Sequence, residues 1–314
     1  TDSFGLINQF DLLNYQHGYQ LKTIDLGGDG RDELLVTGGP GSEPLVTILR
    51  ADGSKINSFL AYAKSFTGGI SLAACDFDGD NKQEILTGAL AGGGPHVRIF
   101  DGFGKPKINT GFFAFDENNK NGIQVGCADL NGDQKDEILV SGILDAQRIL
   151  RVYTASGGFV AESELPFISD TIQLSRIDLG GDGTDEIVVA GGYKDQPEIR
   201  ILRGDLTLVN SFLVYAENFT GGVNIATADI DGDRREEIIT SPYFLGGPHV
   251  RIFDGFGKEK NTSRTFLFNS DFYGGLALAV GNFNQDSNIE IALAPSHLPS
   301  GRTDLYKYID VDVS

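Results

Sequence analysis

The chain has 314 residues, which is enough for two ordinary domains or for one large β-barrel or propeller. Its 42 glycines, its frequent Phe and Tyr residues and its lack of long helix-period stretches favour many short strands joined by tight turns. A formal net charge of −19 argues against nucleic-acid binding, and no segment approaches the length of a transmembrane helix, so no membrane insertion is predicted.

An acidic nine-residue loop recurs along the chain at nearly even spacing. Its first copy, DLGGDGRDE, begins at Asp25, and later copies begin at residues 76, 129, 178, 229 and 282. The spacings are 51, 53, 49, 51 and 53 residues, and the first three copies map onto the last three with one offset of 153 residues. The chain therefore contains two 153-residue halves of three units each, and a period near 50 residues is typical of a propeller or a solenoid.

Each loop offers oxygen atoms from the side chains at positions 1, 3, 5 and 9 and from the carbonyl at position 7. A hard divalent cation takes about six to eight oxygens at about 2.3–2.6 Å, and closely spaced carboxylates repel one another without a cation. An EF-hand fits less well, because it needs a twelve-residue loop between two helices. The predicted calcium ligands are, loop by loop, Asp25, Asp29, Arg31 and Glu33; Asp76, Asp78, Asp80, Lys82 and Glu84; Asp129, Asn131, Asp133, Lys135 and Glu137; Asp178, Asp182, Thr184 and Glu186; Asp229, Asp231, Asp233, Arg235 and Glu237; and Asn282, Asn284, Asp286, Asn288 and Glu290.

The loops differ in their expected strength. Gly27 and Gly180 remove the side chain at position 3, so water must substitute there. The sixth loop has two carboxylates, Asp286 and Glu290, and is expected to be weak or empty. About five Ca²⁺ sites are therefore predicted.

Each unit has the pattern of four antiparallel strands. In the second unit the expected strands are residues 70–75, 84–87, 96–101 and 111–115, with a tight Asp-Gly turn at residues 101–102. Four antiparallel strands make a propeller blade, whereas a parallel β-helix needs shorter rungs without hairpin turns. An all-β, six-bladed β-propeller is therefore predicted, as a single domain over residues 1–314.

The two ends of the chain predict how the ring closes. Residues 5–13 align with residues 158–166 and so have the pattern of an outermost strand without a blade of its own. The last unit ends soon after its third strand, at residues 303–309. The N-terminal strand is therefore expected to complete the C-terminal blade, which removes unpaired sheet edges.

The two cysteines lie close to consecutive acidic loops. Cys75 precedes its loop by one residue and Cys127 by two residues. Because side chains alternate between the faces of a strand, equivalent strands would direct the two thiols to opposite sides. This argues against a disulfide and favours buried apolar thiols, so the cysteines predict no compartment.

The repeated strings resemble a known family. The D-x-D-G-D-x-x-x-E loops, the FTGG motif and the string GGPHVRIFDGFGK, found at residues 93–105 and again at 246–258, are similar to the FG-GAP or VCBS repeats of integrin-alpha-like β-propellers. The resemblance implies calcium on the loops between strands one and two, an extracellular or cell-surface location and a role in binding or adhesion. The chain starts at Thr1 and lacks Met, so it is interpreted as a mature or excised segment, part of a larger multidomain protein.

The loops at the opposite end of the units vary most and are the expected site of recognition. Two of these loops carry three aromatic residues that could stack on a sugar or anchor a protein: Tyr193, Tyr243 and Phe244. His96 and His249 lie in the repeated string, which indicates a scaffold role. No nucleophile elbow, phosphate-binding loop or zinc spacing is present.

The predicted function is a non-catalytic, calcium-stabilised extracellular module that binds a protein or a glycan. Two alternatives remain open. One is a lyase or hydrolase acting on polysaccharide, which would need basic, Tyr or His side chains gathered in one cleft. The other is a spacer domain of a larger surface protein, without a ligand of its own.

Overall fold

The computed structural model describes residues 3–11, 19–107, 111–260, 271–284, 288–297 and 305–312. The predicted ligand Asp286 and the ends of two predicted strands, residues 12–13 and 303–304, lie outside the described residues. Within the described part of the chain, no helix is long and apolar enough to cross a membrane.

The described strands form six antiparallel sheets. The first three contain, in order, β2 (Tyr19–Ile24), β3 (Glu33–Gly38), β4 (Leu45–Leu49) and β5 (Lys55–Leu60); β6 (Ile70–Cys75), β7 (Glu84–Ala89), β8 (His96–Phe100) and β9 (Phe112–Phe113); and β10 (Ile123–Ala128), β11 (Glu137–Leu144), β12 (Gln147–Tyr153) and β13 (Phe159–Leu165). The other three contain β14 (Ile172–Ile177), β15 (Glu186–Gly191), β16 (Glu198–Leu202) and β17 (Leu208–Leu213); β18 (Val223–Ala228), β19 (Glu237–Pro242) and β20 (Arg251–Phe253); and, in spatial order, β21 (Leu276–Gly281), β22 (Glu290–Pro295), β23 (Leu305–Asp312) and β1 (Ser3–Asp11).

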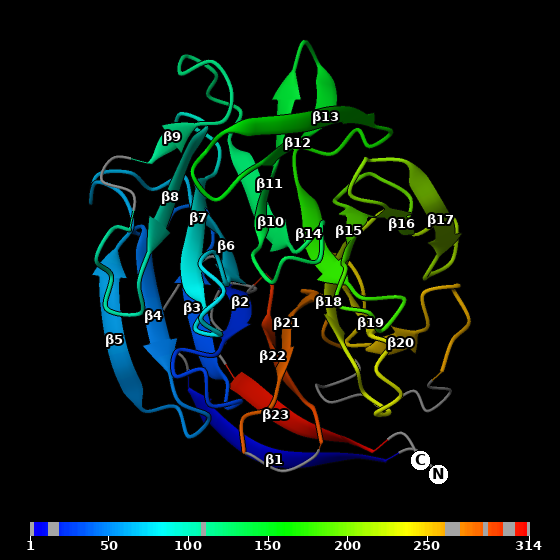
Figure 1. Ribbon diagram of the computed structural model, residues 1–314. Helices are drawn as coiled ribbons and strands as arrows, with labels where there is room; N and C mark the ends of the chain where they lie inside the picture. Colours follow the sequence, from blue (N-terminus) through cyan, green and yellow to red (C-terminus); the bar gives the residue numbers. More distant parts are fainter. Residues whose placement is uncertain are drawn as a thin grey trace.

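The sheets are arranged around a common centre, with the first strand of each sheet innermost (Figure 1). The burial of each strand follows its place in the sheet: β7 is buried at every residue, whereas β13 is exposed at four of its seven residues and buried only at Leu165. A strand that is covered on both faces needs apolar residues throughout, and an outer strand needs them on one face only. The prediction of an all-β propeller with four-stranded antiparallel blades is therefore confirmed.

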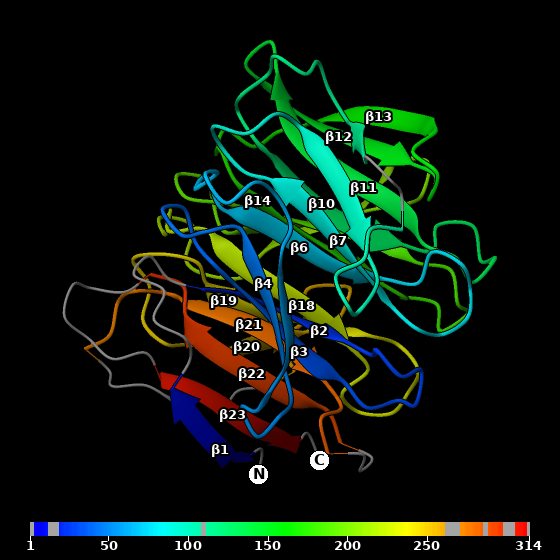
Figure 2. The ribbon, with the colours of Figure 1, turned by 90° about the vertical axis from the view of Figure 1, so that its left-hand side faces the viewer.

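Hydrophobic clusters lie between neighbouring sheets rather than within single sheets. Ile48 of β4 packs in one cluster with Ile70 and Ile85 of the next sheet. The sheet that contains the end of the chain packs against the first sheet in the same way, because Ala279 and Ala292 share a cluster with Leu34. Figure 2 shows β1 and β23 side by side, and their pairing places Ser3 opposite Asp312.

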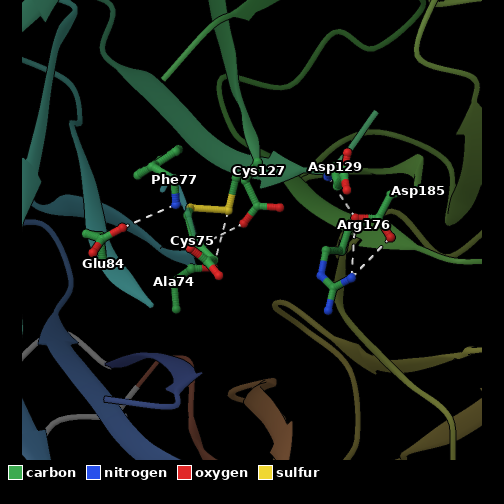
Figure 3. Close-up of a disulfide and its surroundings, with 10 residues drawn as sticks. Ala74, Cys75, Phe77, Glu84, Cys127, Asp129, Arg176 and Asp185 are labelled. Carbon is green, nitrogen blue, oxygen red and sulfur yellow. Dashed lines mark hydrogen bonds and ion pairs between the residues drawn. A yellow bond between two sulfur atoms is a disulfide. The ribbon is translucent and has the colours of Figure 1, made fainter. Parts of the chain in front are cut away.

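The cysteine prediction is wrong, because Cys75 and Cys127 form a disulfide with their Cα atoms 6.0 Å apart (Figure 3). The two residues lie on β6 and β10, the innermost strands of neighbouring sheets. The two thiols do lie on opposite faces of equivalent strands, because Cys127 packs towards the second sheet whereas Ala128, the equivalent of Cys75, packs towards the fourth. Blades, however, pack face to face around the ring, so the forward face of one meets the backward face of the next. Opposite faces are therefore the arrangement that brings the two sulfurs together.

Candidate functional site

The acidic loops share one conformation, which is fixed by the aspartate at position 1. In the third loop, Asp129 Oδ1 accepts the backbone N–H groups of Asn131 and Gly132 at 3.3 and 2.7 Å, and Oδ2 accepts that of Gln134 at 2.6 Å. The equivalent aspartates of the first, second, fourth and fifth loops accept the same kinds of bond. An aspartate that accepts N–H groups further along the chain closes a tight turn around itself.

Glycine at position 4 of the first loop is required by both backbone shape and neighbouring atoms. In the first loop Gly28 has φ 65°, in the left-handed region that favours glycine. A Cβ on Gly28 would also lie 2.9 Å from the carbonyl oxygen of Asn81, in the next loop. Successive loops therefore pack closely against one another.

The carboxylates at positions 5 and 9 accept further backbone hydrogen bonds that hold the loop in its folded shape. Asp80 Oδ1 accepts the N–H of Lys82 at 2.9 Å, and Glu84 Oε2 accepts the N–H of Phe77 at 3.2 Å. Both bonds recur in the first, third, fourth and fifth loops. In the sixth loop, Glu290 Oε2 accepts the N–H of Phe283 at 2.9 Å. The glutamate at position 9 thus folds back against position 2, while the aspartate at position 5 holds the backbone at position 7 and is not among the carboxylates that gather most closely.

Two loops bring three carboxylates especially close. Ligand atoms of Asp76, Asp78 and Glu84 lie within 4.8 Å of one another, and those of Asp229, Asp231 and Glu237 do the same. All of these donors are hard oxygens, which suit Ca²⁺ and not a thiolate-preferring metal. The donor sets are therefore compatible with Ca²⁺. Each of these two groups also forms an ion pair with a lysine. Lys107 pairs with Glu84, and Lys260 pairs with Glu237.

Position 8, which the sequence analysis did not single out, connects each loop to its neighbour. Asp136 Oδ2 accepts the N–H of Asp76 at 2.8 Å, while the N–H of Asp136 donates to the carbonyl of Asp76 at 2.9 Å. The same reciprocal pair joins Gln83 to Asp25, Asp185 to Asp129, Glu236 to Asp178 and Asp32 to Asn282. An acceptor just before the position-9 glutamate in five of six loops was the available sequence signal.

Three of these position-8 groups, Asp32, Gln83 and Glu236, line a cavity of about 330 Å³ together with residues of the innermost strands. Arg176 on β14 reaches into this region, where its Nη1 lies 3.1 Å from Asp185 Oδ1 and its Nη2 lies 3.8 Å from Glu236 Oε1. Burial raises the pKa of Asp136 to about 7, and the nearby Arg176 opposes that shift. Arg176 therefore offsets part of the negative charge that the linked loops gather at this end of the ring (Figure 3).

The three aromatic residues predicted to bind a ligand come together at the opposite end. Tyr193 follows β15, and Tyr243 and Phe244 follow β19. The rings of Tyr193 and Phe244 lie 5.5 Å apart, and Phe244 lies 4.6 Å from the ring of His297, which is 5.0 Å from Tyr243. They line a cleft of about 310 Å³ together with Ile168, Ser169, Asp170, Thr171 and Lys194. We call this cavity the rim cleft.

The FTGG motif of the fifth unit supports the floor of the rim cleft. Gly221 and Gly222 accept the backbone N–H groups of Phe244 and Tyr243 at 2.9 and 3.0 Å, respectively, and Thr220 accepts that of Lys194 at 2.8 Å. A Cβ on Gly221 would lie 1.8 Å from the carbonyl oxygen of Phe244, so only glycine allows this approach. The repeated motif thus fixes the loops that carry the aromatic side chains.

The rim cleft combines stacking surfaces with polar groups. Tyr193 is 40% exposed and Ile168 is 78% exposed, while His297 Nδ1 is buried without a hydrogen-bond partner. Burial lowers the pKa of His297 below its ordinary value, so its imidazole is neutral at pH 7. An aromatic wall with a neutral imidazole, a lysine and an aspartate can stack on a ring and hydrogen-bond to its substituents.

Comparisons with known proteins agree with the fold. A family model described as FG-GAP-like repeat matches residues 178–240. Among curated proteins, no sequence matches the chain. The fold is thus a β-propeller, and the matched segment, which contains the fourth and fifth loops, is similar to an FG-GAP-like repeat.

Three solved structures illustrate the similarity. BBS1N, in a complex with ARL6DN, is 10% identical over 98% of this chain and 97% of its own, with a TM-score of 0.55. An Agrocybe aegerita lectin that recognises non-reducing terminal N-acetylglucosamine is 16% identical over 89% of this chain and 75% of its own, with a TM-score of 0.50. Regucalcin from Agrobacterium tumefaciens, described as a calcium-binding protein, is 12% identical over 98% and 96%, with a TM-score of 0.59. At these identities the likeness concerns the fold alone.

Proposed function

We propose that this propeller is a calcium-stabilised, non-catalytic recognition module that binds a glycan or a protein through the rim cleft. The observation that carries the proposal is the rim cleft itself, where Tyr193, Tyr243 and Phe244 from two blades meet. The cleft lies at the end of the blades opposite the acidic loops, because loops that follow the second strand face away from loops that precede it. The end with the acidic loops would thus stabilise the fold, and the end with the rim cleft would bind the ligand.

Calcium binding is supported by the donor sets of the loops. In the second loop Ca²⁺ would be held by the carboxylates of Asp76, Asp78, Asp80 and Glu84 and by the carbonyl of Lys82. The other loops would use the equivalent residues named in the sequence analysis, with loops one to five as the main sites and loop six as the weakest. Bound Ca²⁺ would supply positive charge that relieves repulsion among the carboxylates.

We also propose that the six sheets are six blades of a closed ring in which β1 completes the last blade. Three observations support closure. β1 pairs with β23, the last sheet shares a hydrophobic cluster with the first, and Asn282 and Asp32 exchange the same reciprocal hydrogen bonds that join other neighbouring loops.

An extracellular or cell-surface location is supported by the disulfide. Disulfides persist in oxidising compartments and are rare where thiols are kept reduced. The Cys75–Cys127 bond therefore favours a secreted or surface protein, of which this chain would be one domain.

Ligand binding is tested with a glycan array and with pull-down of surface proteins, each in calcium and in chelator. The wild-type chain is expected to bind a ligand, and Tyr193→Ala is expected to weaken binding by about tenfold or more, because an aromatic anchor has been removed. Phe256→Ala is the matched control, because Phe256 is an aromatic residue that is 77% exposed at the acidic-loop end. Equal binding by Tyr193→Ala and the wild type, or no ligand for either, would contradict recognition through the rim cleft.

A further inference from the structure

In two acidic loops, a lysine side chain from elsewhere in the same unit lies among the carboxylates. Lys107 Nζ lies 2.8 Å from Asp78 Oδ2 and 2.5 Å from Glu84 Oε1 in the second loop. Lys260 Nζ lies 2.6 Å from Asp231 Oδ2 and 2.5 Å from Glu237 Oε1 in the fifth loop. Each ammonium group therefore bridges the carboxylates at positions 3 and 9, which are both predicted calcium ligands.

The lysines reach the loops from the hairpin after the third strand of the same unit. The N–H of Lys107 donates to the carbonyl of Ile99, and that of Lys260 donates to the carbonyl of Ile252, at 2.9 Å in both cases. In three other sheets the register shifts at the corresponding hairpin leave an apolar residue in this position: Ile56, Val160 and Val209. The lysine is thus a feature of the second and fifth units and not of the hairpin in general.

The charge of the loops explains this distribution. The second and fifth loops have an aspartate at position 3 and hence four carboxylates among their predicted ligands. The first, third and fourth loops have Gly27, Asn131 and Gly180 at position 3 and hence three carboxylates. Counted over the predicted ligand carboxylates alone, one lysine brings a four-carboxylate loop to the charge of −3 that the ligand carboxylates of the other three loops carry. The lysine therefore compensates the extra aspartate.

The bridged glutamates are the most buried carboxylates of these loops. The side chains of Glu84 and Glu237 are 5% and 2% exposed, and their Oε2 atoms already accept backbone N–H groups at 3.2 and 3.0 Å. A buried carboxylate without a cation is costly, so Oε1 needs a positive partner. In the third loop a neutral donor, Asn131 Nδ2, holds Glu137 Oε1 at 3.0 Å instead.

We propose that Lys107 and Lys260 are internal counter-ions that compete with Ca²⁺ for the carboxylates of the second and fifth loops, a role that rests on the calcium binding proposed above. These two loops keep their shape without Ca²⁺ and bind it more weakly than four carboxylates otherwise would. The first, third and fourth loops have no such lysine at the equivalent described position and depend more on the metal. The side chain of Lys107 is 39% exposed, so its ammonium can move to solvent when Ca²⁺ binds.

The test is a calcium titration of the full chain by isothermal calorimetry with Lys107→Met, Lys260→Met and the double variant. Removal of a competing charge is expected to tighten Ca²⁺ binding at the affected loops by about tenfold, with one site affected per substitution. Lys105→Met and Lys258→Met are the matched controls, because these exposed lysines lie in the same hairpins and remove the same net charge. They are expected to match the wild type.

Thermal unfolding gives a second readout, because the melting temperature reports the stability of each variant without a measurement of its calcium affinity. In chelator, the double variant is expected to melt below the wild type, and millimolar Ca²⁺ is expected to restore it. Lys107→Gln and Lys260→Gln, which remove the charge but keep a polar group, are expected to behave in the same way.

The outcomes separate the two proposals. If the wild type binds Ca²⁺ and the double variant titrates like the Lys105→Met and Lys258→Met controls, the competition is wrong while calcium binding stands. If neither the wild type nor any variant binds Ca²⁺, both proposals are overturned. Tighter binding by the controls as well would show a general charge effect and would also overturn direct competition.

Discussion

The aspartate at position 1 folds each of the first five loops and is also a proposed calcium ligand. Its two oxygens fold the loop by accepting N–H groups, as Asp76 does from Gly79 at 2.7 Å and Asn81 at 2.8 Å. Oδ1 of Asp76 already accepts two N–H groups, whereas Oδ2 accepts one and keeps a lone pair that could face a cation. A loop that is folded by its own side chain presents its oxygens in nearly the right place before a metal arrives.

His297 in the rim cleft predicts a pH dependence of stability. Its pKa in the folded state is lowered by burial from the ordinary value of 6.5. The unfolded chain therefore binds the proton more readily, and the free energy of unfolding falls as pH drops from about 6.5 towards the folded-state pKa. Urea denaturation at pH 8 and pH 5.5 is expected to show a smaller acid loss for His297→Gln than for the wild type. Equal losses would assign the acid sensitivity to other groups.

Some residue contacts could be predicted from the sequence and others could not. Asp25 and Glu33 could be placed in one loop because their spacing repeats along the chain. Asp136 could not be assigned to Asp76, because that contact joins two different units and no period within one unit reveals it. Lys107 was missed for a related reason, since a hairpin and not sequence proximity brings it to Glu84.

At the scale of elements, the regular repeat made the strands predictable. The expected strand over residues 70–75 is β6, and the expected strands over 84–87 and 96–101 overlap β7 and β8. The disulfide was predicted wrongly, although the faces of Cys75 and Cys127 were assigned correctly. The stacking of blades is a tertiary relation that strand periodicity alone does not contain.

Removal of the disulfide is expected to destabilise the contact between the second and third sheets. The bond joins residues 52 positions apart, and loss of a native disulfide typically costs about 2–5 kcal/mol through the unfolded state. Cys75→Ala with Cys127→Ala should therefore lower the midpoint of urea denaturation. Wild-type protein treated with a reductant is the control and should shift in the same direction, whereas an unchanged midpoint in both would show that packing alone holds these sheets together.

At the scale of the whole molecule, the acidic loops form a chain of contacts around one end of the propeller. Each reciprocal pair supplies two hydrogen bonds between neighbouring blades, and only the second and third blades are also joined by the disulfide described above. Such pairs are worth about 1 kcal/mol per bond, and more where a charged group is involved. Together the five reciprocal pairs join the acidic loops into a belt at this end of the propeller.

Removal of calcium is expected to lower the melting temperature of the whole molecule. A site with a dissociation constant of about 0.1 mM gains about 1.4 kcal/mol in 1 mM Ca²⁺. Three sites without a competing lysine would then contribute about 4 kcal/mol, a large share of a typical net stability. Differential scanning calorimetry in EGTA should show a lower melting temperature, which Ca²⁺ but not Mg²⁺ restores. No change in EGTA would contradict the calcium sites.

The belt has one irregular link. Position 8 of the sixth loop is Ile289, whose side chain has no acceptor to offer the N–H of Asp229, whereas the other five loops have Asp, Gln or Glu there. In the closed ring proposed above, this weaker joint is the preferred place to open. A circular permutant whose new ends lie between the fifth and sixth loops, with the present ends connected, would therefore disturb the ring least. Reversible opening of the propeller during folding would begin at the same place.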